Sequence, residues 1–546
     1  MESPNDYGVQ GAGAGVDDIQ WQSARYSRRE ALRRFGGVGA AIALPSLAGT
    51  DGVANAARLL RDTTKAPSGT LRVASAQNLA QLDPFKYVFD WDNQSLSCIY
   101  SGLTQFTESG GATPQPAMAE SWTVSPDLMT YTFNLRKDLL SAKGQPITGE
   151  IIVASIKRAI AKKTAYYGAS FFPPIASLTA PNSRTVRFQL KTPSATLATW
   201  LTTYMPITMP DTVANAAAQQ GPDTTGPFKV SEFVTDQHMY LEPNPHWWGA
   251  PVKLSAIQII TAQDNTSAVT SLQAGSLDAL WGAPYTAIAR LIKDPKFKVL
   301  TSKLPGTSHT YEVDIASPPF NNVNARLALA HSVDRRTIMN SAYAGLGQMT
   351  NTNVPVATNS PYFDSSLPAI PFDLDKAKSL FASAGVSKST PLTFWCASGQ
   401  YPEWTVAGQI ISADLAKIGI SLKVTPVDIS TWVAKFFPKG KKYPGYVVAN
   451  FGTAGPDILA LERLDPRVYE GNWNDPQVQT MMAQAQKTKS MSAAKAIYNR
   501  VEQQFSQQAP AASLMMFDNP LVQSAKVQGT WIAPNGNCHL ENASLT

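Results

Sequence analysis

The sequence predicts an α/β protein of more than one domain, and three observations support this. The chain has 546 residues, and at roughly 150 residues per domain this length suits two to four domains. Hydrophobic residues make up 44% and charged residues only 16%, which favours folded cores over coiled coils or extensive disorder. In the later part, capped helices that stop at glycine alternate with short strands, as in α/β layers.

The first third of the folded chain is predicted to be rich in strands. Thr70–Ala74, Thr130–Leu135 and Thr185–Leu190 alternate between apolar and polar residues, which is typical of half-buried strands. Between them, Ile151–Lys163 has helical periodicity, with Thr148 as its predicted N-cap. This part therefore mixes strands with isolated helices, unlike the rest of the chain.

The later part carries repeated helix start and stop signals. The predicted caps and stops are Asp264 with Gly275, Asp334 with Gly345, and Asp373 with Gly385. A helix over Glu403–Lys417 is followed by a strand over Ser421–Val427, and two more helices cover Asp475–Lys487 and Ser492–Gln508. This order predicts βαβ-type layers.

Residues 1–56 are interpreted as a leader rather than as part of the fold. Arg28 and Arg29 precede an uncharged stretch, Phe35–Thr50, and Ala54-Asn55-Ala56 offers a cleavage site. This is the order of a signal peptide, and the paired arginines favour the twin-arginine type. The alternative is a basic amphipathic helix that caps the domain, which does not explain the cleavage site. No cysteine follows the apolar stretch, so we expect an exported protein without a lipid-anchor cysteine.

Composition and motifs argue against several classes of function. A balance of 46 basic and 40 acidic residues leaves no nucleic-acid footprint. The three cysteines and five histidines stand apart, so we expect no disulfide framework, no metal site and no cofactor. Motifs of metalloproteases, serine hydrolases and phosphate-binding loops are missing from the sequence. We therefore expect no catalytic residues and no enzyme.

Ten short segments occur in an order that resembles one family. They are 82–84 (LDP), 116–122 (PAMAESW), 130–136 (TYTFNLR), 225–228 (TGPF), 244–249 (NPHWWG), 272–278 (LQAGSLD), 319–320 (PF) with Arg326, 332–336 (SVDRR), 377–385 and 415–420 (LAKIGI). Together they resemble the extracytoplasmic solute-binding proteins of ABC importers, in the oligopeptide, dipeptide and nickel group. The resemblance runs from about Thr70 to Gly529.

The resemblance implies a two-lobed periplasmic-binding-protein fold with an extra small domain and a ligand cleft between the lobes. Residues 70–102, 210–308 and 510–546 would form lobe I, with 103–209 as the inserted domain and 309–509 as lobe II. Crossovers near His309–Asp314 and Gln508–Ala512 would be the hinges. The implied partners are a small solute and the membrane permease of an ABC importer, and we expect a monomer that stays outside the cytoplasm.

The resemblance also implies where a ligand binds. In the peptide binders of this family a peptide adds as a strand to both lobes, which makes Gln77, Asn78 and Leu79 candidates in lobe I. In lobe II the matching segment is 449–457, with Asn450, Phe451, Gly452 and Asp457 as candidates. The family's aspartate, which binds the peptide's α-ammonium, is replaced by Ala454, so recognition of a free N-terminus is not implied here. Asp314, where the family commonly has asparagine, is a second departure.

Aromatic residues are a further set of candidates. Trp281, Trp395, Trp432, Tyr285 and Tyr311 lie where the family's pocket runs, although each residue equally suits a hydrophobic core. We expect a peptide or peptide-like solute. The alternatives are an oligosaccharide or a specialised metabolite on the same fold, or a hydrolase built on this scaffold.

Overall fold

The computed structural model describes most of the chain after the leader. It describes residues 69–75, 81–86, 90–109, 111–164, 166–217, 220–262, 264–303, 307–350, 352–397, 401–436, 443–451, 473–517 and 520–546. Contacts divide the chain into two units, Met1–Lys65 and Ala66–Thr546, and every described residue lies in the second unit. The predicted leader, with Arg28 and Arg29, lies outside the described residues.

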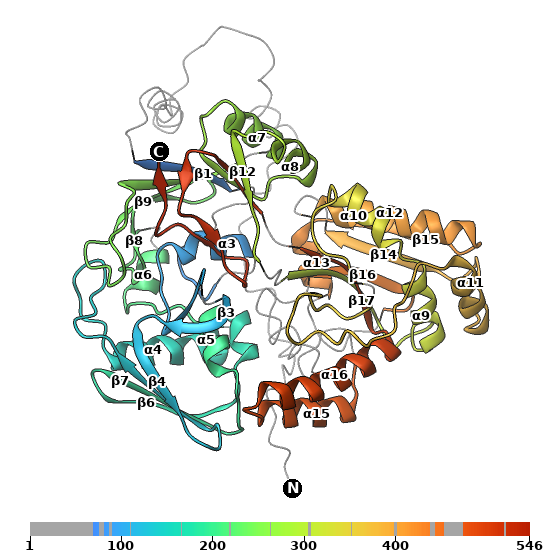
Figure 1. Ribbon diagram of the computed structural model, residues 1–546, viewed down its shortest axis with the longest axis horizontal. Helices are drawn as coiled ribbons and strands as arrows, with labels where there is room; N and C mark the ends of the chain where they lie inside the picture. Colours follow the sequence, from blue (N-terminus) through green and yellow to red (C-terminus); the bar gives the residue numbers. More distant parts are fainter. Residues whose placement is uncertain are drawn as a thin grey trace. The chain divides into compact units, whose positions relative to one another are not determined.

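A seven-stranded sheet combines early, middle and late parts of the chain (Figure 1). Its order is β12-β18-β11-β1-β10-β9-β8; β1 is parallel to β10 and β11, and the other neighbours are antiparallel. The strands are β1 (Thr70–Ser75), β8 (Phe228–Val234), β9 (His238–Pro243), β10 (Ala256–Thr261), β11 (Ala279–Trp281), β12 (Phe297–Leu300) and β18 (Leu521–Ser524). Helices α7 (Asn265–Gln273) and α8 (Tyr285–Leu291) pack on the face that carries Ala74, Leu280 and Val522.

A four-stranded antiparallel sheet is formed by the segment expected to be inserted. Its order is β4-β5-β7-β6, with β4 (Ala119–Val124), β5 (Thr130–Leu135), β6 (Ile175–Asn182) and β7 (Thr185–Leu190). Helix α4 (Gly149–Ile160) packs on β6 and β7. The apolar face predicted for β5 is confirmed, because Tyr131, Phe133 and Leu135 are buried. These side chains share one hydrophobic core with Leu71 and Val73 of the seven-stranded sheet.

Smaller elements complete this part of the chain. They are the hairpin β2 (Thr104–Thr107) and β3 (Gly111–Pro116), the helices α3 (Asp90–Ser97), α5 (Leu197–Tyr204) and α6 (Thr212–Ala217), and the short pairs β19 (Val527–Gln528) with β22 (Ser544–Leu545) and β20 (Trp531–Ile532) with β21 (Cys538–His539). Cys98 and Cys538 lie in this core, and both are free and buried, as is Cys396 elsewhere.

A five-stranded sheet forms the second core. Its order is β15-β14-β16-β13-β17; β14 is parallel to β15 and β16, and β13 is antiparallel to β16 and β17. The strands are β13 (Thr307–Val313), β14 (Leu392–Ala397), β15 (Leu422–Val427), β16 (Tyr446–Phe451) and β17 (Ala511–Phe517). The helices are α9 (Val323–His331), α10 (Arg335–Ala342), α11 (Leu374–Ser383), α12 (Pro402–Lys417), α13 (Ile429–Phe436), α15 (Pro476–Gln486) and α16 (Met491–Gln508). The pair α15 and α16 encloses a smaller core with Trp473.

The three acidic helix caps were predicted correctly. The side chains of Asp264, Asp334 and Asp373 each accept a hydrogen bond from a backbone N–H in the first turn of their helix, as N-cap residues do. Thr148 precedes α4 but makes no side-chain capping bond. Among the residues that the structure describes, no helix is both long enough and apolar enough to span a membrane.

The expected crossovers were misplaced. His309–Val313 belong to β13 and Ala511–Ala512 to β17, so both segments are inside the five-stranded sheet. The chain passes from one sheet to the other between Leu300 and Thr307, and again between Phe517 and Leu521. The reason is that β17 pairs with β13, so the strand after α16 completes the second sheet before the chain returns. The remaining domain limits stay a prediction.

Candidate ligand-binding site

Polar and aromatic side chains gather at one edge of the five-stranded sheet. Because β14, β15 and β16 are parallel, their carboxyl ends meet at the same edge, and the antiparallel β13 begins there. The register pairs His309 at the start of β13 with Phe451 at the end of β16. Ligands of open α/β sheets bind at such carboxyl ends, so this edge is a candidate ligand-binding site.

His309 lies at the centre of a buried aromatic cluster at this edge. Its Nδ1 and the Tyr343 hydroxyl are hydrogen-bonded at 2.5 Å. The ring centroids of Tyr343, Tyr401 and Trp404 lie 5.6, 5.7 and 5.3 Å from the imidazole centroid. Burial holds the pKa of His309 well below its ordinary value, because a charged imidazole would lose its hydration there. The imidazole is therefore neutral near pH 7.

Glu403 is the acidic member of this cluster. It lies in the first turn of α12, after Pro402 at the helix start, and only 8% of the residue is exposed. Its Oε1 lies 3.9 Å from Nδ1 of His309. Burial raises the pKa of the carboxyl to about 8, although the residue's own backbone N–H lowers it. At neutral pH this position therefore holds an uncharged carboxylic acid.

Close packing fixes α12 against the sheet and so fixes Glu403. Gly408 of α12 lies on the ring of Phe394 in β14, where a Cβ atom would come within 2.6 Å of the ring. Trp404 is fully buried, and its ring stacks on Tyr401 with centroids 4.3 Å apart. The carboxyl is thus presented by a rigid element, not by a loop.

The seven-stranded sheet has a comparable edge. The parallel strands β1, β10 and β11 end together at Ser75, Thr261 and Trp281, and Tyr285 then begins α8. The rings of Tyr285 and Tyr343 meet edge to face, with centroids 5.2 Å apart. This contact joins the carboxyl edge of one sheet to the aromatic cluster at the carboxyl edge of the other.

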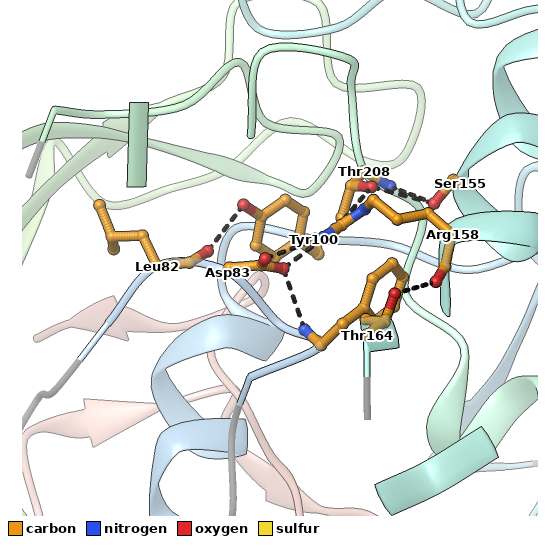
Figure 2. Close-up of polar contacts among 8 residues, drawn as sticks. Leu82, Asp83, Tyr100, Ser155, Arg158, Thr164 and Thr208 are labelled. Carbon is orange, nitrogen blue, oxygen red and sulfur yellow. Dashed lines mark hydrogen bonds and ion pairs between the residues drawn. The ribbon is translucent and has the colours of Figure 1, made fainter. Parts of the chain in front are cut away.

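A network of polar and charged contacts holds residues 82–85 in place (Figure 2). Nη1 and Nη2 of Arg158, on α4, donate to the two carboxylate oxygens of Asp83 at 2.8 and 3.0 Å. The guanidinium also covers the Phe85 ring, 4.3 Å from its centroid, and donates to Thr208. The Tyr100 hydroxyl donates to the carbonyl of Leu82 at 2.9 Å. The Leu-Asp-Pro segment is therefore a structural anchor that ties α4 to the first sheet.

The structure places the predicted residues in different surroundings. Gln77, Asn78, Leu79, Gly452 and Asp457 lie outside the described residues. Asn450 and Phe451 form the carboxyl end of β16, at the edge described above. A role of these positions in ligand binding stays a prediction.

The predicted aromatic residues divide into buried and half-buried ones. Trp281, Tyr311 and Trp432 are at most 2% exposed and pack into the two main cores; Trp432 also donates its indole N–H to the carbonyl of Ala449 at 3.2 Å. Trp395 is half-buried, and Nζ of Lys435 lies 3.6 Å from its ring centroid. In this conformation, Tyr285 is the candidate that links the two edges.

Sequence reasoning missed His309, Tyr343 and Glu403. His309 was set aside because it stands alone in the sequence, and Glu403 was assigned only to a helix. One local signal was available, since Tyr401-Pro402-Glu403-Trp404 sets an acidic residue among aromatic ones at the start of the predicted helix. Asp314, the other departure, has a local role: it is buried and accepts hydrogen bonds from Ser317 and from the N–H of Tyr443.

Comparison with known proteins decides the family. Residues 113–466 match the family described as bacterial extracellular solute-binding proteins, family 5 middle. The chain belongs to this family. Its members are substrate-binding proteins that act outside the cytoplasm. Among the described residues, no group of three or more His, Cys, Asp or Glu side chains is placed to hold a metal ion.

Individual relatives agree with this assignment. The glutathione-binding protein GsiB of Shigella flexneri is 25% identical over 489 residues, which cover 87% of this chain and 94% of that protein. The heme-binding protein A of Haemophilus influenzae is 29% identical over 366 residues, which cover 61% of this chain and 65% of that protein.

A solved structure shows the same fold. The periplasmic binding protein DppA of Helicobacter pylori, in complex with the peptide STSA, superposes with a TM-score of 0.75 at 21% identity. The match covers 88% of this chain and 98% of that one. This chain therefore has the two-lobed periplasmic-binding-protein fold.

Proposed function

We propose that this family 5 protein is the extracytoplasmic solute-binding component of an ABC importer and that its solute is a peptide or a peptide-like compound. Family membership supports the binding role. The observation that carries the location of the site is the Tyr285–Tyr343 contact, because it brings together the carboxyl edges of the two sheets.

The proposed site uses both edges. Lobe I contributes the segment after β1, with Gln77, Asn78 and Leu79, and lobe II contributes the end of β16, with Asn450, Phe451 and Gly452. Backbone N–H and C=O groups at strand ends can pair with an extended peptide, which gives affinity without reading side chains. Aromatic rings beside such an edge suit the apolar parts of the solute. The protein would act as a monomer without catalysis and hand its solute to a membrane permease.

The identity of the solute can be tested on protein from its own host. The intact chain would be isolated from the extracytoplasmic fraction and examined by native mass spectrometry, before and after denaturation. We expect a bound mass that fragments as a peptide or an amino-acid conjugate. A bound oligosaccharide, tetrapyrrole or other compound without an amide bond would contradict the peptide class, while leaving the binding role in place.

A further inference from the structure

A backbone hydrogen bond joins the region of the four-stranded sheet to the helix pair α15 and α16. The N–H of Ala195, in the loop between β7 and α5, donates to the carbonyl of Gln486 at 3.1 Å. Gln486 is the last residue of α15. Because the last carbonyls of a helix have no partner within it, this N–H satisfies an acceptor that α15 itself leaves open.

The donor side of this contact is anchored in the fold. Ser194 donates its N–H to the carbonyl of Leu128 at 3.2 Å, and its own carbonyl accepts the hydroxyl of Tyr131 at 2.5 Å. Tyr131 lies in β5, with its side chain in the core shared with the seven-stranded sheet. On the other side, Thr196 is the N-cap residue of α5. Ala195 is therefore held between β5 and α5.

The acceptor side is also well supported. Val478, Met482 and Ala485 of α15 are buried in the small core that this helix forms with α16. Beyond the helix end, the hydroxyl of Thr488 donates to the carbonyl of Gln484 at 3.0 Å. The hydrogen bond therefore joins two packed parts of the chain.

Charges beside the hydrogen bond favour the same contact. Asp127 lies in the turn between β4 and β5, and Lys489 follows α15. Hydrogen bonds from Ser125 and from the N–H of Met129 lower the pKa of the Asp127 carboxyl, and the positive charge of Lys489 lowers it further. The two opposite charges attract each other across the contact, although water keeps the attraction weak at exposed positions.

The position of the contact relates it to closure. The chain crosses between the two larger sheets at residues 300–307 and 517–521, and neither Ala195 nor Gln486 belongs to a crossing. Figure 1 shows α15 at the lower edge of the view, beside the elements of the four-stranded sheet. A hinge rotation about the crossings would separate this donor from its acceptor, so the hydrogen bond belongs to the closed form.

We propose that the hydrogen bond between Ala195 and Gln486 is a latch by which the region of the four-stranded sheet stabilises the closed form of the protein. This inference rests on the proposed function, because a solute that is enclosed between two parts binds best to the closed form. Ala195 lies outside the candidate solute site. Solute affinity nevertheless depends on it, since the apparent Kd rises as the closed fraction falls.

The latch can be tested on the full chain without knowing the solute. Spin labels at Arg187→Cys on β7 and Ala496→Cys on α16, two exposed positions, report the distance between the two parts by double electron–electron resonance. The three native cysteines are buried, which limits their labelling. Ala195→Pro removes the N–H donor, and Ala195→Gly is the matched control that keeps it. We expect the proline variant to lower the closed-to-open ratio about two- to tenfold, as for the loss of one hydrogen bond, and the glycine variant to stay close to wild type.

A second variant does not depend on the fold tolerating proline. Lys489→Glu places a like charge opposite Asp127 and should lower the closed-to-open ratio by up to about fivefold. Adding Asp127→Asn should restore the ratio, because this change removes the repulsion and keeps an oxygen acceptor in the turn. A merely structural role of Lys489 would not be rescued in this way.

The outcomes separate the latch from the proposed solute class. The measurement is repeated with an equimolar library of tripeptides, which populates the closed form if the wild type is mostly open. Unchanged ratios in Ala195→Pro and Lys489→Glu, equal losses in the proline and glycine variants, or a wild type that never shows the closed distance would each overturn the latch. If the ratio responds to the variants but not to the peptides, the peptide class fails and the latch stands.

Discussion

Asp83 and Glu403 are two buried carboxyls in the two main cores, and they are satisfied in different ways. Asp83 is 5% exposed and forms a bidentate ion pair with Arg158, with N···O distances of 2.8 and 3.0 Å. Glu403 is 8% exposed, and among the described residues the nearest basic atom to its carboxyl is Nδ1 of His309, at 3.9 Å. A buried carboxylate that is paired with a cation links two structural elements. A buried carboxyl without such a pair keeps its proton at neutral pH. Asp83 is therefore part of a structural ion pair, whereas Glu403 is a buried neutral acid.

The largest loss of stability is expected when the cationic partner of Asp83 is removed. Arg158→Ala would leave the Asp83 carboxylate buried without its cation, and this should lower the free energy of unfolding by about 3 kcal/mol. Urea unfolding followed by tryptophan fluorescence measures the change. The exposed pair of Lys229 and Glu242 gives the control, since Lys229→Ala should cost no more than about 1 kcal/mol. Equal costs for the two variants would show that Asp83 is not anchored by Arg158.

A smaller, pH-dependent effect is expected at Glu403. Its pKa in the folded protein is raised to about 8 from an ordinary 4.5, so its stabilising contribution is complete below about pH 4.5 and is lost as pH rises toward 8. Relative to Glu403→Gln, wild type should therefore lose about 2–3 kcal/mol of stability between pH 5 and pH 7.

His309 gives a contribution of opposite sign. Its pKa is lowered by burial, so its stabilising contribution is lost as pH falls below its ordinary value of about 6.5. Because both proteins contain His309, the difference between their urea midpoints across the pH series isolates Glu403. A difference that does not change with pH would mean that the carboxyl is ionised in the folded protein.

The smallest loss of stability is expected for substitutions of Lys435, which is half-exposed. Lys435→Met removes the ammonium that lies over the ring of Trp395, and this should cost about 0.5–1 kcal/mol. Lys435→Arg keeps the positive charge and should retain most of the stability. If both variants are equally destabilised, the contact depends on packing of the lysine stem rather than on its charge.

Local signals predicted much of the fold. The acidic caps and the alternating strands are encoded within a few neighbouring residues, so Asp334, Asp373 and the buried face of β5 were predicted correctly. The crossovers were misplaced because the pairing of β17 with β13 depends on long-range contacts. The same limit applies to the site. Glu403 and His309 meet only because β13 and α12 pack together, and no spacing in the sequence reports that contact.

The protonation state of Glu403 in the solute-free protein tests the central claim most directly. Infrared spectra of wild type and Glu403→Gln, recorded at neutral pH in the same buffer, can be subtracted to isolate this one side chain. We predict a protonated carboxylic acid C=O band that is present in wild type, absent in the variant, and lost from wild type above about pH 8. A difference spectrum that shows only an ionised carboxylate at neutral pH would contradict the account.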